Sequence, residues 1–558
     1  MYHQVLDPIA HSLAWSSLVA ALPLLTLFVL LGVLRWAAWI ASLIALAVSL
    51  VVAVWAYGMP VGQAVLAGSE GAAFGFFPIL WIVINAIWVY NMTVATGHFD
   101  VLRRSFASVS DDQRIQAMLI AFCFGALMEA LAGFGTPVAV TAVMLIALGF
   151  APLKAAVLAL TANTAPVAFG AMATPIITLG SVTGRSSDTL GAMVGRQTPV
   201  LALFVPLILV LIVDRKNGIR ETWPAIVVCG ASFAAAQYVT SNFISVPLAD
   251  VVASLASAAA VMALVRVWRP VRVYTEAVAA PAMSGGVVPA LSGDMPEAEA
   301  EQPAESSSER TDPPREIARA YAPYLIIIAV FVLAQIGPVK SWLGHATRQF
   351  AWPGLHLLNA KGGKVGSVTF TLNIATSPGT QMLVAGVLTM AVLGISIPKA
   401  LRAYGATLFQ LRWAILTVMA VLALAYVMNA SGQTITLGTW MAAAGGLFAV
   451  LSPLLGWLGT AVTGSDTSSN SLFGALQVTA AGKAGLSQTL MAAANSSGGV
   501  LGKMVSPQNL AIAAAAVGLQ GREGDIFRRV LGWSLLFLLG MCLLVWLQST
   551  PVLSWMVA

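Results

Sequence analysis

Long, continuously apolar segments recur along this chain, and they limit its fold more than any other feature. Residues 201–213 are apolar at every position, whereas a strand of a membrane barrel alternates apolar and polar residues. A helical span needs about 20 apolar residues, and 59% of the 558 residues are hydrophobic while only 9% are charged. An ordinary soluble protein is about 25% charged. The chain is therefore predicted to be an all-α polytopic membrane protein in a lipid bilayer, which excludes a soluble enzyme, a nucleic-acid-binding protein and a disordered scaffold.

The apolar segments fall into two groups, and together they predict about 12–14 transmembrane helices. The candidate spans lie at residues 13–31, 36–57, 74–95, 115–131, 136–150, 191–213, 222–240 and 247–265, and then at 321–338, 380–397, 413–429, 440–458, 487–502 and 529–548. Between the groups, residues 269–319 are rich in Pro, Ser and Glu and lack apolar periodicity, which predicts a disordered cytoplasmic linker. The expected organisation is a first membrane repeat at 1–268 and a second at 320–558.

The Lys and Arg residues near the ends of the candidate spans predict the orientation of the chain. Such residues concentrate in the cytoplasmic loops of membrane proteins, so we place the basic clusters on that side. One candidate span precedes Arg35 and one follows Arg529, which puts both termini in the periplasm and gives the two halves opposite orientations. If every basic cluster is cytoplasmic, the chain must cross the membrane an even number of times between one cluster and the next. This requires one further crossing near 155–180 and another near 461–482.

Two segments in the two halves, at 162–175 and 494–507, resemble each other with a constant offset of 332 residues. The matched positions are Asn163 and Asn495, Gly170 and Gly502, Met172 and Met504, Thr174 and Ser506, and Pro175 and Pro507. A second similar pair lies upstream, at 133–136 and 464–467. Chance similarity between alanine- and glycine-rich segments is the alternative. Inverted repeats with Gly- and Pro-interrupted apolar segments are typical of secondary transporters, so we predict two inverted-topology repeats with broken or re-entrant segments.

Three ionisable residues lie in or beside these segments. Glu129 is the only charged residue between Arg114 and Lys154, and Asp466 lies in a polar stretch after an apolar one. Because an ionisable group at membrane depth is costly and usually marks a proton or ion pathway, both carboxylates are candidates for proton coupling. A structural carboxylate is the alternative for Glu129, and a periplasmic loop for Asp466. Lys503 would pair with a substrate carboxylate or with Asp466, or extend to the membrane interface.

Uncharged hydrogen-bonding residues at the predicted breaks are candidates for binding a small hydroxylated carboxylate. Non-helical backbone at membrane depth is tolerated where it is buried or lines a watery cavity, and exposed helix N-termini favour anions. The candidate substrate-binding residues are Gly135, Thr136, Asn163, Thr164, Asn495, Ser496, Ser497 and Lys503. Tight-turn residues without ligand contact are the alternative interpretation.

Other classes of function fit the sequence poorly. The five His residues fall in loops or at span ends, and no H-E-x-x-H motif occurs, so we predict no enzyme, no metal site and no cofactor. Without a nucleotide-binding domain, ATP-driven transport by this chain alone is excluded. An anion channel stays open as an alternative, although a channel does not need two occluding broken segments.

Four segments near the predicted breaks have long and distinctive sequences. They read L-M-E-A-L-A-G-F-G-T-P-V-A-V (127–140), T-A-N-T-A-P-V-A-F-G (161–170), T-G-S-D-T-S-S-N-S-L-F-G-A-L-Q (463–477) and A-A-N-S-S-G-G-V-L-G-K-M-V-S-P-Q (493–508). These segments resemble the bacterial lactate permease family, and the resemblance covers nearly the whole chain outside 269–319.

The resemblance implies proton-coupled uptake of L-lactate, with D-lactate and glycolate as related substrates, across the bacterial inner membrane. It also implies membership of a wider ion-transporter superfamily with re-entrant hairpins, which would make 155–180 and 487–507 partly re-entrant. The stretch T-G-S-D-T-S-S-N could instead hold Na⁺ through Asp466 and backbone carbonyls, so a sodium-coupled carboxylate carrier stays open as an alternative. The oligomeric state is not predicted.

Overall fold

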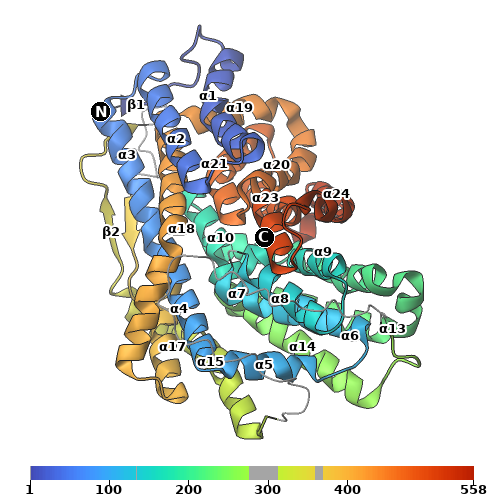
Figure 1. Ribbon diagram of the computed structural model, residues 1–558. Coiled ribbons are helices and arrows are strands. Elements are labelled where there is room, and N and C mark those ends of the chain that lie inside the picture. The colour runs from blue at the N-terminus through green and yellow to red at the C-terminus, as the bar shows by residue number, and fades with distance from the viewer. Residues whose placement is uncertain (1, 134, 276–311, 359–368) are drawn as a thin grey trace.

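The computed structural model describes residues 2–133, 135–275, 312–358 and 369–558, and most of them are helical (Figure 1). The first part contains α1 (Leu13–Phe28), α2 (Ala38–Val51), α3 (Val61–Phe74), α4 (Trp81–Ala95), α5 (His98–Ala107), α6 (Gln113–Gln116), α7 (Gly125–Ala132), α8 (Thr136–Ala147), α9 (Pro152–Ala162), α10 (Gly170–Thr183), α11 (Ser187–Val194), α12 (Thr198–Ala202), α13 (Val205–Val239) and α14 (Ala249–Val267). The second part contains α15 (Pro314–Gln335), α16 (Gly337–Gly344), α17 (Pro378–Leu393), α18 (Ile397–Ser431), α19 (Gln433–Met441), α20 (Phe448–Thr463), α21 (Asp466–Ala484), α22 (Gln488–Gly502), α23 (Pro507–Ala516) and α24 (Glu523–Gln548).

Short strands occur near the start of the chain and between α16 and α17. Strand β1 (Tyr2–His3) pairs in parallel with β3 (Leu357–Leu358). Strand β2 (Arg348–Ala351) pairs antiparallel with β4 (Thr369–Leu372). Each is too short to cross a bilayer, since a membrane-spanning strand needs about 9–11 residues.

The predicted all-α polytopic membrane fold is confirmed, with fewer candidate spans than expected. Among the described residues, ten helices are long and apolar enough to cross a membrane, or up to eleven if a bent pair counts as one span. The predicted spans 136–150 and 380–397 correspond to shorter apolar helices, α8 and α17. The predicted spans 191–213 and 222–240 fall within one helical stretch, Ser187–Ile244. Hydropathy located the helices correctly, but helix length and continuity depend on packing and on local breaks.

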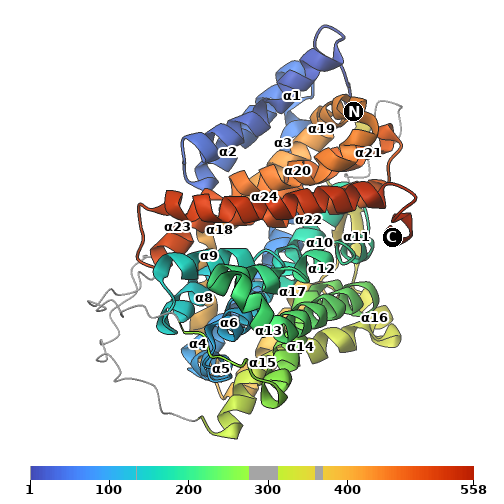
Figure 2. The ribbon, with the colours of Figure 1, turned by 90° about the vertical axis from the view of Figure 1, so that its right-hand side faces the viewer.

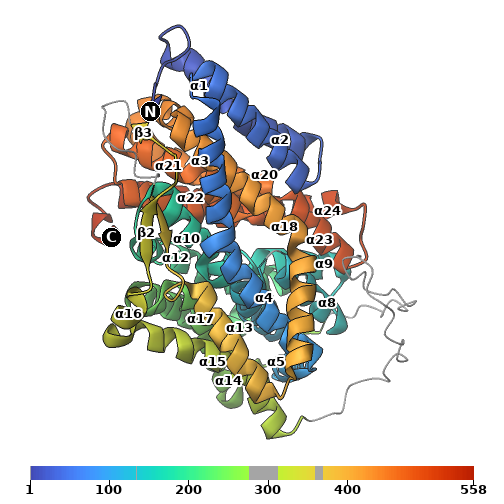
Figure 3. The same ribbon diagram turned by 90° about the vertical axis from the view of Figure 1, so that its left-hand side faces the viewer.

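Helices α7–α10, which lie between residues 125 and 183, form the centre of the molecule. Figure 1 shows α7, α8, α9 and α10 between a group that includes α1, α2 and α19–α21 and another that includes α13 and α14. Helix α24 crosses one face of this centre (Figure 2), and α3, α4 and α18 cover another (Figure 3). In Figure 2 both termini lie toward one side of the molecule, and the turn between α23 and α24 lies on the other. This arrangement agrees with the relative sidedness expected from charge, whereas the side that faces the periplasm stays a prediction.

Helices α20 and α22 pack closely because glycines leave room for the neighbouring backbone. A Cβ on Gly498 would lie 2.1 Å from the carbonyl oxygen of Pro453, and one on Gly502 would lie 2.2 Å from that of Trp457. Small residues at a helix interface allow this approach in membrane proteins. The contact holds α22, which carries part of the predicted second repeat segment, firmly against α20.

Two arginines bind the chain on either side of residues 276–311. These residues make up most of the predicted linker, 269–319, and lie outside the described part of the chain. Arg104 donates two hydrogen bonds to Asp312, at 2.9 and 2.8 Å, and the guanidinium lowers the pKa of that carboxyl. Arg114 donates to the carbonyl oxygen of Arg272 at 2.7 Å. From Pro314 onward the predicted linker is helical, because α15 begins there.

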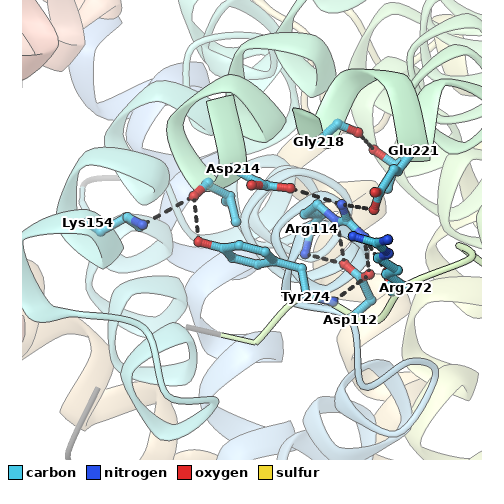
Figure 4. A network of polar contacts seen from close by, with 10 residues as sticks. Asp112, Arg114, Lys154, Asp214, Gly218, Glu221, Arg272 and Tyr274 are labelled. Carbon is cyan, nitrogen blue, oxygen red and sulfur yellow. Dashed lines mark hydrogen bonds and ion pairs between the residues drawn. The ribbon is translucent and has the colours of Figure 1, made fainter. Parts of the chain in front are cut away.

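Arg114 lies at the centre of a buried ionic cluster, shown in Figure 4. Only 1% of its side chain is exposed, and its guanidinium contacts Asp112, Asp214 and Glu221 at 2.7, 2.9 and 2.8 Å. Arg114 has a packing role, because it joins the start of α6 to the break in α13 at Asp214.

We expect Arg114→Met to lower the free energy of unfolding by about 3–5 kcal/mol, because it leaves buried carboxylates without their cation. Thermal unfolding of the purified protein in detergent measures this loss. Arg103→Met is the matched control, since Arg103 is 44% exposed and its contact with Asp100 is 3.7 Å long. An exposed pair contributes at most about 1 kcal/mol. Equal unfolding temperatures for the two variants would contradict a structural role for the cluster.

Candidate functional site

Four interruptions of helix meet near the centre of the molecule. Helix α7 ends at Gly133, where φ is +33°, and Gly464 separates α20 from α21 with φ at +76°. Helix α9 and the helical stretch Val167–Thr183, which contains α10, are bent by 64° at the break between them, residues 163–166. The fourth interruption is the 3₁₀ turn Lys503–Val505, between α22 and α23. The predicted break at 155–180 is therefore present, whereas 487–507 is a continuous helix until its last residues.

A cavity of about 50 Å³ lies where these interruptions face one another. It exceeds the roughly 10–15 Å³ that one water requires, so it has room for more than one water. Glu129, Asp466 and Lys503 all line it, together with Thr174, Gln508 and Asn509. Three ionisable side chains from distant parts of the chain thus share one small, buried space.

Glu129 and Lys503 form an ion pair in this cavity. Lys503 Nζ lies 2.6 Å from Glu129 Oε1, and only 7% and 4% of the two side chains are exposed. Asn163 Nδ2 donates to the other carboxylate oxygen at 2.9 Å. The carboxylate also packs against Gly170, where a Cβ would lie 2.8 Å from Oε1. Lys503 thus pairs with Glu129, which was not among the partners predicted for it, and its contact with a substrate carboxylate stays a prediction.

Asp466 is the first residue of α21, and its carboxylate is held by neutral donors. Oδ2 accepts hydrogen bonds from Ser496 Oγ at 2.6 Å and from Asn470 Nδ2 at 3.3 Å. Oδ1 and the nearby hydroxyl of Thr460 are buried without a hydrogen-bond partner among the described residues. A Cβ on Gly499 would lie 2.0 Å from Oδ1 and 2.8 Å from Thr460 Oγ1, which places both atoms beside the same point of α22. Asp466 is thus buried in a helical junction rather than exposed in a periplasmic loop.

The remaining predicted site residues do not line the cavity. Asn495 donates to Asn470 and accepts from Gln477, so both the nitrogen and the oxygen of its amide are engaged inside the helix cluster. Ser497 donates to Gln197 Oε1 at 2.7 Å. These contacts tie the helices together.

The other three uncharged candidates lie in the first part of the chain. Gly135 and Thr136 begin α8, and a Cβ on Gly135 would meet the side chain of Ile512. Thr164 is buried, and its hydroxyl has no hydrogen-bond partner in the part of the chain that the structure describes. None of the three contributes to the cavity wall, so their substrate-binding role stays a prediction without a contact to support it.

Several polar residues of the site were not singled out in the sequence. Asn470 lies four residues after Asp466 on the same helix face, and Gln508 and Asn509 directly follow the second repeat segment. Asp250 is also fully buried, at the start of α14, where Gln237 Nε2 donates to its Oδ1 at 2.7 Å. It is the only charged residue between Glu221 and Arg266. The signal that selected Glu129, an isolated charge in an apolar stretch, would have selected Asp250 as well.

The chain is similar to known transport proteins over nearly its whole length. A family model described as L-lactate permease matches residues 16–552. The glycolate permease GlcA of Escherichia coli (strain K12) is 42% identical over 537 residues, covering 94% of each chain. The L-lactate permease of Bacillus subtilis (strain 168) is 40% identical over 580 residues, covering 99% of each chain. Among solved structures, the YdaH transporter of Alcanivorax borkumensis aligns over 86% of each chain with 15% identity and a TM-score of 0.42.

Proposed function

The chain belongs to the L-lactate permease family, and we propose that it is a secondary transporter for L-lactate and related 2-hydroxy monocarboxylates such as D-lactate and glycolate. The relatives named as glycolate and L-lactate permeases support this choice of substrates. We further propose that uptake is coupled to protons and takes place across the bacterial inner membrane.

The observation that carries the proposal is the charge balance of the cavity. Two carboxylates, Glu129 and Asp466, line it together with one ammonium, Lys503. A bound monocarboxylate would add a further negative charge to a buried space, where an uncompensated charge is costly. A cation that enters with the substrate removes this excess. A proton on one of the carboxylates is the smallest such cation and requires no additional space.

Exchange of the Lys503 partner provides a mechanism for this coupling. When Glu129 is ionised, its Oε1 accepts a hydrogen bond of 2.6 Å from the ammonium of Lys503, which is then not available to a substrate. When Glu129 accepts a proton, the ammonium becomes available to the carboxylate of the substrate, and the amides of Gln508 and Asn509 are near enough to the cavity to bind its hydroxyl. A proton and a monocarboxylate are together neutral, so their movement avoids the roughly 2.3 kcal/mol per 100 mV that a single charge requires.

Sodium coupling is the second candidate, and one feature of Asp466 favours it. Asp466 Oδ1 and Thr460 Oγ1 are both buried without hydrogen-bond partners in the described part of the chain. A Na⁺ ion between oxygen atoms would satisfy both of them, whereas in the proton mechanism a protonated Asp466 would donate to the hydroxyl. An anion channel is the third candidate, although its flux would never run uphill.

Uptake of radiolabelled L-lactate into proteoliposomes separates these candidates. We expect accumulation above the external concentration with an inward proton gradient, no accumulation with a Na⁺ gradient alone, and competition by excess glycolate. Liposomes without protein and a proton gradient collapsed by an ionophore are the controls. Accumulation only with Na⁺ would indicate that transport is coupled to Na⁺, bound by the Asp466 and Thr460 oxygens. Flux that only equalises the two sides would indicate a channel.

A further inference from the structure

A second polar pocket lies at the other end of α10 and α22 from the central cavity. Its volume is about 400 Å³, and it is lined by Thr183, Arg185, Ser186, Thr189, Val478 and Gln488. Ser186 and Thr189 are exposed, so the pocket, which we call the Arg185 pocket, is open to solvent. In Figure 2 the neighbouring helix α11 lies on the side of the molecule that carries both termini.

Arg185 has only neutral partners in this pocket. Its Nη1 donates to Thr489 Oγ1 at 3.0 Å, and its Nη2 donates to Gln488 Oε1. Its Nε is buried without a partner, and no acidic side chain among the described residues forms an ion pair with it. Arg114, which has a structural role, contacts three carboxylates instead. The guanidinium of Arg185 therefore keeps an uncompensated charge and an unused donor.

Helix ends beside the pocket add to its positive potential. Helix α11 begins directly after Ser186, and α22 begins with Gln488 and Thr489. The free N–H groups at a helix N-terminus favour anions. Asp188, in the first turn of α11, is exposed and has the opposite effect. Lys483, at the end of α21, is exposed but does not line the pocket.

We propose that the Arg185 pocket is a docking site where the substrate carboxylate binds before it reaches the central cavity. This inference rests on the proposed function, since it takes a monocarboxylate as the substrate. The planar fork of a guanidinium matches a carboxylate and binds it in a bidentate way. Thr489 and Gln488, which Arg185 now contacts, can then bond the 2-hydroxyl of the substrate.

The position of the pocket relative to the central cavity supports this role. Helix α22 has 15 residues, and a helix rises 1.5 Å per residue, so the two sites are about 20 Å apart along it. Gly170 lies at the other end of α10 and Lys503 directly follows α22, and both residues line the central cavity. An anion released by Arg185 would therefore start beside the ends of α10 and α22 that face away from the central cavity. The opposite ends of these helices lie beside Glu129 and Lys503.

The test is transport kinetics of Arg185→Gln in right-side-out and inside-out membrane vesicles. We expect the KM for L-lactate to rise at least tenfold on the side that carries both termini, with kcat changed less than twofold and KM unchanged on the other side. Raising the ionic strength should raise the wild-type KM and leave that of the variant nearly constant, because salt screens exposed charges. Arg185→Lys, which keeps the charge but loses the fork, should give an intermediate KM.

Two variants control for charge loss at the same end of the molecule. Arg196 donates to Asn242 Oδ1 and to the carbonyl oxygen of Met556, so Arg196→Gln removes a nearby arginine outside the pocket. Lys483→Gln removes an exposed neighbouring cation. Both should leave KM within twofold of the wild type. A tenfold rise in either would indicate a general field effect and overturn the assignment to Arg185.

Other outcomes distinguish the alternatives. A lower kcat with an unchanged KM would make Arg185 a latch between α10 and α22, and would overturn the docking site. An effect that vanishes in liposomes without anionic lipid would assign the pocket to a lipid headgroup and overturn it as well. If Arg185→Gln does not fold, the Arg185→Lys kinetics decide alone, since an unchanged KM contradicts the proposal. A wild-type protein that moves no L-lactate would contradict the proposed function, whereas normal wild-type transport with an unaffected variant contradicts only this inference.

Discussion

Replacing Glu129 with Gln is expected to lower proton-driven accumulation of L-lactate at least 100-fold. Gln cannot exchange a proton, so the ammonium of Lys503 is no longer released and recaptured as the substrate binds and leaves. The substitution also leaves Lys503 buried without its anion, and the loss of one partner of a buried pair costs about 3–5 kcal/mol of stability. Proteoliposome uptake and thermal unfolding in detergent measure the two effects separately.

The double variant Glu129→Gln/Lys503→Gln separates stability from transport. It removes both buried charges, so it should regain most of the lost stability, since neutral replacement of a buried pair is often tolerated. Accumulation should stay absent, because neither the proton site nor the substrate cation is restored. If Glu129→Gln alone accumulates L-lactate like the wild type, Glu129 does not carry the coupling proton. If the double variant regains transport, the pair is structural only.

Glu129 and Asp466 could be singled out from the sequence, but their partners could not. An isolated charge in an apolar stretch is visible in one dimension, and the cost of burying it indicates a role. Lys503 lies 374 residues from Glu129, and no local pattern says which distant segment approaches which. The repeat similarity at 133–136 and 464–467 pointed to the cavity, because both segments contribute residues to its wall. Whether the two halves are related by inverted topology stays a prediction.

The uncharged candidates show where one-dimensional reasoning fails. Asn495, Ser496 and Ser497 are consecutive on α22, and successive residues of a helix point about 100° apart. Only Ser496 therefore bonds to Asp466, while Asn495 bonds to Asn470 and Gln477 further along α21 and Ser497 bonds to Gln197. A sequence shows that hydrogen-bonding groups are concentrated at a position. The rotation of the helix, which tertiary packing fixes, decides which of them reaches Asp466.

Gly499→Ala is expected to abolish at least nine-tenths of L-lactate transport, although the residue carries no chemistry of its own. The added Cβ would lie 2.0 Å from Asp466 Oδ1 and 2.8 Å from Thr460 Oγ1, so the carboxylate must move away from α22. That movement breaks its 2.6 Å contact with Ser496 and displaces it from the cavity. Transport in proteoliposomes, with protein amount normalised by fluorescence size-exclusion, measures the loss.

Helix propensity makes the result of this substitution diagnostic. In a helix interior, Ala is more favourable than Gly by about 0.8–1.0 kcal/mol, so without a clash Gly499→Ala would stabilise α22. Gly532→Ala is the matched control, because a Cβ at Gly532 in α24 meets nothing within 4 Å, and transport should be unchanged. Asp466→Asn should reproduce the Gly499→Ala loss without the steric change. Normal transport by Gly499→Ala together with loss in Asp466→Asn would mean that the carboxylate works equally well when shifted. Normal transport by both would exclude Asp466 from coupling.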